Sequence, residues 1–203
     1  MMSPLTPLFG RLNLPAFMTP TRRILRAFVP LLAAAAVACS DDDNLPSPTD
    51  ENRIDTLMIG SLTDTPITTP SGFAVEDGDV RTDQDANFDF AFDIEPDGRP
   101  VFLPRAALGL PATNSADPGI QRRNESFDEI VVARSNGYVT DEAVPVQVGE
   151  RYLVRSRVIC SGLGVPVYAK LEILSIADGF VELKVLADRN CGYKGLEPGL
   201  PDR

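Results

Sequence analysis

Histidine and tryptophan are absent from this chain of 203 residues, and cysteine occurs only three times. Without histidine, the chain has no Ser-His-Asp or Cys-His catalytic apparatus, no imidazole metal ligand and no side chain that ordinarily titrates near neutral pH. The lack of tryptophan weakens any sugar-stacking platform. The chain also has no Walker loop and no Rossmann glycine fingerprint. We therefore expect no cofactor, and we favour a role other than catalysis.

Long hydrophobic runs are missing as well. The most apolar stretch, "AFVPLLAAAAVA" (27–38), has 12 residues, whereas a bilayer-spanning helix needs about 20. It follows the basic stretch "TRRILR" (21–26) and ends in small residues before Cys39. This order is typical of a secretory signal peptide, which we predict over residues 1–38. A start at Met18 would give a signal of common length, and the paired arginines leave twin-arginine export open as an alternative route.

The residues before Cys39 resemble a known pattern. Ala36, Val37, Ala38 and Cys39 are similar to the lipobox of bacterial lipoprotein signal peptides, with alanine at position 36 where the family usually has leucine. The resemblance implies that Cys39 becomes the first residue of the exported protein. It would carry a diacylglycerol thioether and an amide-linked acyl chain such as palmitate, which anchor the protein to a membrane of the cell envelope. An ordinary cleaved signal, with Cys39 as a free thiol, is the alternative.

Basic residues are scarce behind the signal. From Cys39 onward the chain has 15 basic and 29 acidic side chains, a formal net charge of −14. The excess lies in residues 41–97, which hold 16 acids against Arg53 and Arg81. Such a surface repels phosphate backbones and anionic headgroups. We therefore expect no nucleic-acid partner, and membrane association through the lipid anchor alone.

The segment directly behind the cysteine has little apolar content. "SDDDNLPSPTDENR" (40–53) contains five acids, two prolines and only Leu45 as a large aliphatic residue. Such a composition does not bury enough apolar surface to offset the entropy of ordering. We predict a disordered, lipidated acidic tether over residues 39–53, followed by one folded domain over residues 54–203.

No segment of that domain has a sustained helical period. Short β-rich stretches broken by Gly, Pro and Asp instead predict an all-β fold, an antiparallel sandwich. The segment 109–124 is predicted to be a long loop. The strands predicted before the last third cover 56–60, 88–94, 100–104, 129–133 and 144–148.

The last third predicts a three-stranded meander over 151–160, 167–176 and 180–187. A three-residue loop at 177–179, with Gly179 in the left-handed region, makes one face of the second hairpin continuously apolar. The loop at 161–166 is predicted to close the first hairpin. The resulting pairs are Ile176 with Phe180, Ser175 with Val181, Ile173 with Leu183, Leu171 with Val185, Ala169 with Ala187, Val158 with Ala169, Ser156 with Leu171, Val154 with Ile173 and Tyr152 with Ser175.

The other face of the meander carries a row of alternating charges. Arg155 is predicted opposite Glu172, and Glu172 opposite Lys184. Four apolar residues also gather at one end of this face. We favour cover by another segment of the chain, with a partner-binding patch as the alternative. These four residues are Leu153, Leu174, Ile176 and Phe180.

Once Cys39 is lipidated, only Cys160 and Cys191 remain. The meander places both at the same end of the sheet, flanking the middle strand, and export would bring them into a compartment that permits disulfides. A bridge requires 188–193 to fold over that strand, because α-carbons must come within about 7 Å. We predict this disulfide, with two free thiols as the alternative.

Two further patterns could belong to a calcium site and to a serine-lysine catalytic site, but we interpret both as structural. Asp83, Asp85, Asn87 and Asp89 alternate as in half of a calcium loop, but Phe88 and Ile94 stand where that loop needs glycine and glutamate. We predict instead a half-buried strand whose acidic face includes Asp89 and Asp93, with a calcium site of other geometry as the alternative. Serine-lysine chemistry would need Lys170, Lys184 or Lys194, and the first two fall on predicted strands, where paired or solvated roles are usual.

A second resemblance concerns the domain. "GERYLVRSRV" and "YAKLEILSI" are similar to strand pairs of uncharacterised exported β lipoproteins and, more distantly, of lipoprotein haemophores. Haem binding does not carry over, because this chain has no histidine. We expect an exported, lipid-anchored envelope protein with a binding or structural β domain and a protein or small-molecule partner. A carboxylate-dependent hydrolase such as a glycosidase and a calcium-dependent adhesion module are the alternatives.

Overall fold

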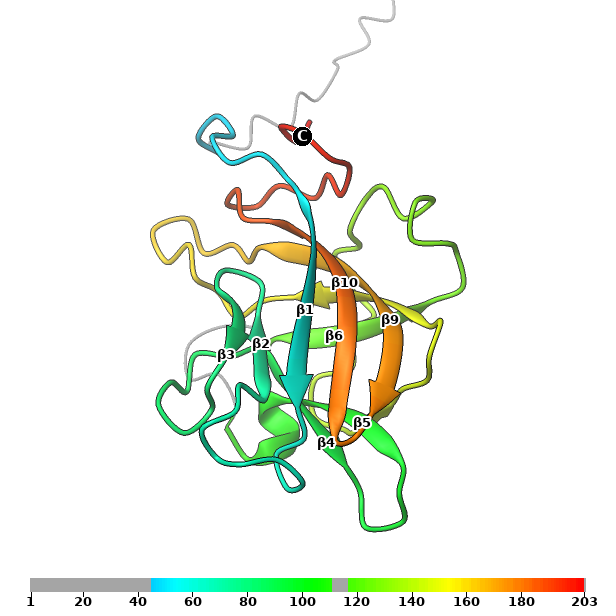
Figure 1. Ribbon diagram of the computed structural model, residues 1–203. Helices are drawn as coiled ribbons and strands as arrows, with labels where there is room; N and C mark the ends of the chain where they lie inside the picture. The colour runs from blue at the N-terminus through cyan, green and yellow to red at the C-terminus, as the bar shows by residue number, and fades with distance from the viewer. Residues whose placement is uncertain (1–44, 111–116, 203) are drawn as a thin grey trace, which may run out of the picture. The chain divides into compact units, whose positions relative to one another are not determined.

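The computed structural model describes residues 45–110 and 117–202. Its strands form two antiparallel five-stranded sheets (Figure 1), which confirms the predicted all-β sandwich. The first sheet has the order β1 (Ile54–Gly60), β10 (Phe180–Asp188), β9 (Tyr168–Ala177), β8 (Arg151–Arg155) and β6 (Gly119–Arg123). The second has the order β3 (Gly78–Val80), β2 (Gly72–Ala74), β4 (Phe90–Ile94), β5 (Pro100–Pro104) and β7 (Val144–Pro145), and the 3-10 helix η1 (Arg105–Leu108) follows β5.

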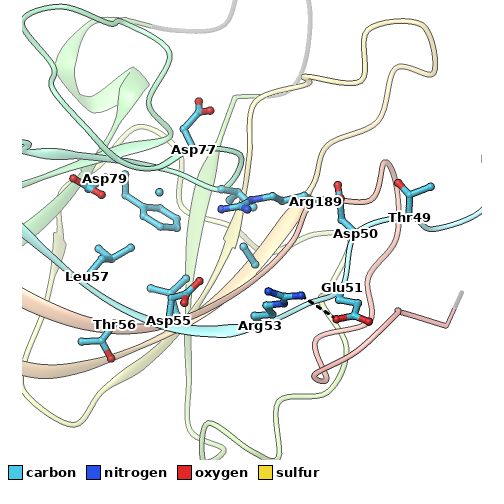
Figure 2. A pocket seen from close by; sticks show the side chains of 15 residues that line it. Thr49, Asp50, Glu51, Arg53, Asp55, Thr56, Leu57, Asp77, Asp79 and Arg189 are labelled. Atoms are coloured by element: carbon cyan, nitrogen blue, oxygen red, sulfur yellow. Dashed lines mark hydrogen bonds and ion pairs between the residues drawn. The ribbon is translucent and has the colours of Figure 1, made fainter.

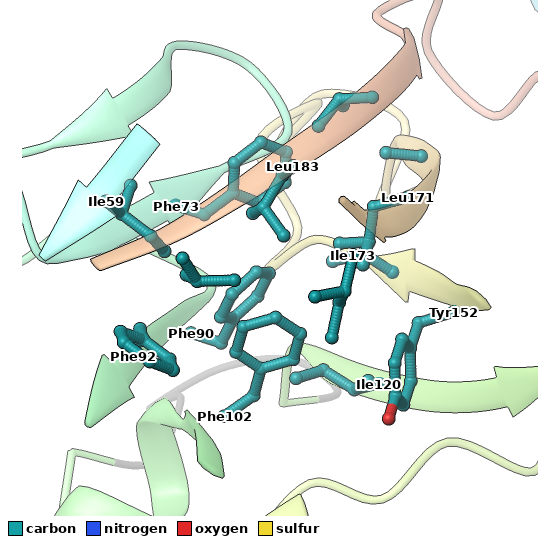
Figure 3. Close-up of a cluster of buried hydrophobic side chains, with 14 of the residues drawn as sticks. Ile59, Phe73, Phe90, Phe92, Phe102, Ile120, Tyr152, Leu171, Ile173 and Leu183 are labelled. Atoms are coloured by element: carbon teal, nitrogen blue, oxygen red, sulfur yellow. The ribbon is translucent and has the colours of Figure 1, made fainter. Parts of the chain in front are cut away.

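Alternating apolar residues of both sheets meet in the core between them (Figure 3). Aromatic rings dominate the side of the second sheet, where Phe90 and Phe102 lie 4.5 Å apart between ring centroids. The Phe102 ring also meets Tyr152 of β8 edge to face at 5.7 Å. Such edge and tilted contacts are the geometry that aromatic pairs prefer. Phe102 therefore joins the two sheets at the centre of the sandwich.

The β9–β10 hairpin confirms most of the predicted register and corrects its turn. Leu183 pairs with Ile173, and Lys184 with Glu172, as predicted. The turn has two residues instead of three, since Phe180 pairs with Ala177 and Val181 with Ile176. A register shift between Glu182 and Leu183 restores the predicted pairing. The prediction was wrong at the turn because it assumed a regular ladder, whereas a bulge places one extra residue in β9.

The β8–β9 pairing differs from the prediction by four residues. Tyr152 pairs with Leu171, and Val154 with Ala169. Because the shift is even, the same side chains still face the core. The predicted Arg155 row is wrong, since Arg151 lies opposite Glu172. Strand β8 ends at Arg155 instead of Cys160, and residues 156–167, which contain an isolated bridge between Cys160 and Val165, connect it to β9.

Two other segments also differ from the predictions. Strand β6 lies inside the predicted loop 109–124, whereas the predicted strand 129–133 makes only an isolated bridge, between Val132 and Gly195. Ile130 and Ala133 instead pack over the outer face of the first sheet. They form a second buried cluster whose other members are Phe127, Leu153, Tyr168, Leu186 and Leu196.

This second cluster covers one of the four apolar residues that were predicted to gather on the outer face. Leu153 is fully buried, so a segment of the same chain covers it, as favoured from the sequence. Leu174, at the far end of β9, stays 39% exposed. Within the described residues, no helix has both the length and the apolar character needed to cross a membrane.

The described part of the predicted tether is bonded to the domain. Backbone N–H groups of Thr49 and Asp50 donate to the side-chain oxygen of Asn190, at 2.8 and 3.0 Å. Asn52 is buried and pairs with Gly199 through both its N–H and its C=O. Composition alone predicts disorder here, because it does not register hydrogen bonds to a remote segment. Residues 49–52 therefore belong to the folded domain, which was predicted to begin at Ile54.

Candidate functional site

A cleft of about 720 Å³ opens between β1 and the β2–β3 hairpin (Figure 2). Strand β1 is the edge of the first sheet, and β3 is the edge of the second. The cleft therefore lies at the side of the sandwich where neither sheet has a further strand among the described residues. Its lining residues are Thr49, Asp50, Glu51, Arg53, Asp55, Thr56, Leu57, Phe73, Val75, Asp77, Gly78, Asp79, Val185, Ala187 and Arg189.

The cleft combines an apolar floor with a charged rim. Phe73 and Val75 are fully buried core residues, and Leu57 is half-buried. The rim holds five carboxylates against the guanidinium groups of Arg53 and Arg189, so it is net acidic. Only five of the 15 lining residues are apolar, so charged and polar groups dominate this cleft. The five acids are Asp50, Glu51, Asp55, Asp77 and Asp79.

Most of the charged side chains on the rim have no partner in the part of the chain that the structure describes. Arg53 pairs with Glu51 at 3.3 Å. Within residues 45–110 and 117–202, no hydrogen bond or ion pair engages the side chains of Asp55, Asp77, Asp79 or Arg189. These groups are exposed and solvated in the free protein. The carboxylates of Asp55, Asp77 and Asp79 are therefore available to a cationic ligand without breaking a contact among the described residues.

The outer edge of β1, beside the cleft, has no paired strand in the described part of the chain. Asn52 exchanges two hydrogen bonds with Gly199, and the Gly60 N–H donates to the Pro70 carbonyl at 2.8 Å, both on the side away from β10. Backbone groups of alternate residues point to the same side of an antiparallel strand. Ile54, Thr56 and Met58 thus present their N–H and C=O groups to the outer edge of β1, since β10 is the only strand of the described residues that pairs with it.

Asp89 lies in the core instead of on the predicted acidic outer face. Its side chain is 1% exposed, and its oxygens accept from the N–H groups of Val75 and Arg157 at 2.8 and 2.9 Å. Burial raises the pKa of Asp89 to about 6, although these hydrogen bonds and the charge of Arg157 oppose the shift. The strand prediction was wrong here because the ladder begins at Phe90.

The other members of the pattern at 83–89 have local roles. Asp83 pairs with Arg81 at 2.8 Å, and Asp85 accepts from the N–H of Asn87. Asp93 accepts hydrogen bonds from Ser61 and Thr63. Among the residues that the structure describes, no group of three or more acids or cysteines is placed to hold a metal ion.

The lysines considered for serine-lysine chemistry are placed differently from one another. Lys170 is buried, and its ammonium donates to the carbonyls of Phe127 and Ile130 at 2.8 and 2.9 Å. Burial lowers the pKa of Lys170. Lys184 lies over the Phe127 ring at 4.1 Å. Lys194 donates to the hydroxyl of Ser135 at the surface, at 2.9 Å.

The predicted disulfide is present. Cys160 and Cys191 are bonded, with α-carbons 5.9 Å apart. The Gly192 N–H donates to the Pro166 carbonyl at 3.2 Å, so the segment after β10 crosses to the β8–β9 connection as the prediction required. Cys39 lies outside the described residues, and its predicted lipidation stays a prediction.

No protein-family model matches the chain, and no curated protein or solved structure does either. Sequence reasoning did not find the cleft, because its lining comes from three segments, 49–57, 73–79 and 185–189, that only the fold brings together. One available signal was "EDGD" (76–79), a turn-forming acidic stretch that follows the short apolar run 73–75.

Proposed function

We propose that the protein is an exported, lipid-anchored lipoprotein of the cell envelope whose β-sandwich domain binds a ligand in the acidic cleft. The observation that carries the proposal is the order basic stretch, 12-residue apolar run, small residues and Cys39. Two lipid chains on Cys39 would anchor stably, where one is marginal. The Cys160–Cys191 bridge supports export, because disulfides persist in oxidising compartments.

Few residues separate Cys39 from the folded domain, and this limits the distance of the domain from the membrane. Cys39 precedes Leu45 by six residues, and six residues reach at most about 20 Å when fully extended. Pro46 is already held, since its carbonyl accepts from the hydroxyl of Tyr193 at 3.0 Å. A lipid on Cys39 would therefore keep this end of the domain close to the bilayer, and the proposed cleft, lined in part by Thr49 and Asp50, would open near the surface.

The proposal favours binding over hydrolysis. A glycosidase needs a general acid with a raised pKa beside the substrate. Burial raises the pKa of Asp89 and of Asp188. Both carboxyls are buried and accept backbone N–H groups, and neither lines the cleft. The acids that line the cleft can attract and orient a charged ligand, which is a property of a binding site.

Mass spectrometry of the mature protein tests the anchor. The full chain, expressed in a bacterial host and extracted in detergent, should begin at Cys39 and carry the added mass of a diacylglyceryl group and an acyl chain. Cys39→Ala should stay unprocessed and unmodified, whereas Ala36→Leu, which restores the usual lipobox residue, should be processed fully. An unmodified Cys39 at the mature terminus, or a mature chain that begins elsewhere, would contradict the proposal.

A further inference from the structure

We propose that the free edge of β1 accepts an extended basic segment of a partner polypeptide as an added strand, which lies in the acidic cleft. The inference rests on the binding role proposed for the cleft and names the class of ligand. It combines a row of unpaired backbone groups, a rim of unpaired carboxylates and an apolar floor, all on one side of the sandwich.

The backbone supplies the register. Between Asn52, which is paired with Gly199, and Gly60, which is bonded to Pro70, three residues of β1 have N–H and C=O groups on the outer edge with no partner among residues 45–110 and 117–202. An incoming strand can pair with Ile54, Thr56 and Met58 without displacing any existing bond. Addition of a strand to an exposed sheet edge is a recurrent mode of peptide recognition, in which the backbone supplies affinity and alternate side chains supply specificity.

The side chains of the cleft specify the ligand. Asp55 and Leu57 lie two positions apart on β1 and share the face that is turned to the cleft. A peptide strand beside them places alternate side chains on the same face, one opposite the carboxylate and the next opposite the leucine. The matching ligand therefore has a basic residue and an aliphatic residue two positions apart. Asp77 and Asp79, on the other wall, favour further positive charge.

Charge also decides between a foreign segment and a second copy of this chain. Pairing two β1 edges would bring two net acidic rims together, on chains that each have a net charge of −14 from Cys39 onward. Like charges brought together oppose association. A basic segment gains attraction from the same groups. The occupant that fits the edge is therefore a cationic polypeptide.

Peptide binding to the full chain in detergent tests the proposal. The probe is an acetylated and amidated peptide of about seven residues, with lysine and valine at successive odd positions and threonine between them. Its affinity is measured by fluorescence anisotropy at low and at high salt. The same peptide with glutamate in place of lysine should not bind, and salt should weaken the lysine peptide, because the rim charges are exposed.

A proline on β1 separates strand pairing from simple charge attraction. Thr56→Pro removes an N–H that points to the free edge, so it leaves the β1–β10 ladder intact, as proline does on edge strands. It should weaken the lysine peptide about tenfold or more, because a hydrogen bond is lost and the ring blocks the edge. Thr56→Val, the matched control, removes the hydroxyl but keeps the N–H, so it should weaken the lysine peptide far less than Thr56→Pro does.

Modified peptides give a second reading in case the proline variant fails to fold. N-methylation of the alternate residues that face β1 should abolish binding, whereas N-methylation of the intervening residues should not. Asp55→Asn combined with Asp79→Asn should weaken binding about three- to tenfold. Asp141→Asn, at an exposed residue outside the cleft, should have no effect.

Three outcomes would overturn the proposal. They are equal binding of both N-methylated peptides, no binding of the lysine peptide even at millimolar concentration, and dimerisation of the protein through β1 that Thr56→Pro abolishes. None of these outcomes depends on the mass of the mature terminus. A failed peptide test leaves the lipid anchor standing, and an unmodified Cys39 leaves the peptide site standing.

Discussion

At the scale of single residues, Asp89 shows how a buried charge connects the two sheets. Its carboxylate accepts from Val75, which follows β2, and from Arg157, which follows β8. The guanidinium of Arg157 lies 3.7 Å from the same carboxylate. Each contact favours the ionised form, yet burial costs more, and the pKa of Asp89 rises to about 6. Asp89 thus joins the segments that follow β2 and β8. Burial of its carboxyl group away from water is the free-energy cost of this connection.

This balance predicts a pH dependence of stability. The pKa of Asp89 is about 6 in the folded state against 3.8 as its ordinary value, so between these values the folded state binds more protons. The free energy of unfolding should therefore fall as pH rises from about 4 to about 6, by up to about 3 kcal/mol from this group. Asp89→Asn should abolish that contribution, as urea unfolding across this range would measure.

The slope is the informative quantity in this experiment. Asp89→Asn avoids the buried charge but leaves one backbone N–H without an acceptor, which costs about 1–3 kcal/mol. The two effects oppose each other at pH 7. A difference in unfolding free energy between the unchanged protein and Asp89→Asn that stays constant from pH 4 to pH 7 would contradict the pKa assignment.

For Lys170, the sequence predicts the face of the sheet on which the side chain lies but not the residues that cover it. Period-2 alternation in β9 places its side chain on the outer face of the first sheet, as expected from the sequence. What covers it could not be derived, because Phe127 and Ile130 come from a segment that the pattern assigns in part to a strand. The ammonium is satisfied by two carbonyls, so its burial serves to dock that segment.

At the scale of elements, the β9–β10 hairpin shows which part of a register the sequence determines. The apolar pattern fixed the pairs from Leu183 onward, because a slip by one residue would place a lysine against the core. It did not fix the turn. Asp178 and Gly179 both have positive φ, at 51° and 82°, as a two-residue type I′ turn requires. The bulge between Glu182 and Leu183 then shifts the register by one residue, so that a two-residue turn is compatible with the predicted pairs.

The turn gives a prediction about Gly179. At φ of 82°, a β-carbon is strained whatever space surrounds it. Gly179→Ala should lower the free energy of unfolding by about 1–2 kcal/mol. The matched control is Gly162→Ala, where φ is not positive and nothing lies within 4 Å of the added carbon. It should be neutral or slightly stabilising. Equal destabilisation by the two variants in urea unfolding would contradict this account.

At the scale of the whole molecule, the sequence predicted the class of fold but not the side on which the sandwich opens. The cleft exists because β1 and β3 are edges of different sheets that lie beside each other. Their adjacency depends on long-range strand order, which local periodicity does not encode. The acidic excess of residues 41–97 was visible from composition, and the fold concentrates part of it on the cleft rim.

Long-range contacts also explain how residues 49–52 are held against the domain. The segment after β10 is fixed by the Cys160–Cys191 bridge, which stabilises by about 3–4 kcal/mol in the chain-entropy model. Asn190, one residue before Cys191, accepts from two N–H groups of the incoming chain and donates to the Asp50 carbonyl at 2.8 Å. The disulfide thus positions the side chain that binds the N-terminal segment beside the cleft.

Removing that side chain should release the segment. Asn190→Ala loses its bonds to residues 49 and 50 and leaves buried Asp188 without its amide partner. We expect a loss of about 1–3 kcal/mol in the free energy of unfolding. Hydrogen exchange should speed up at the amides of Thr49 and Asp50 and stay unchanged in β9. Asn136→Ala, in an exposed loop, is the matched control. Unchanged exchange at both amides would show that Leu45 and Pro46 hold the segment by themselves, and the cleft wall would then not depend on Asn190.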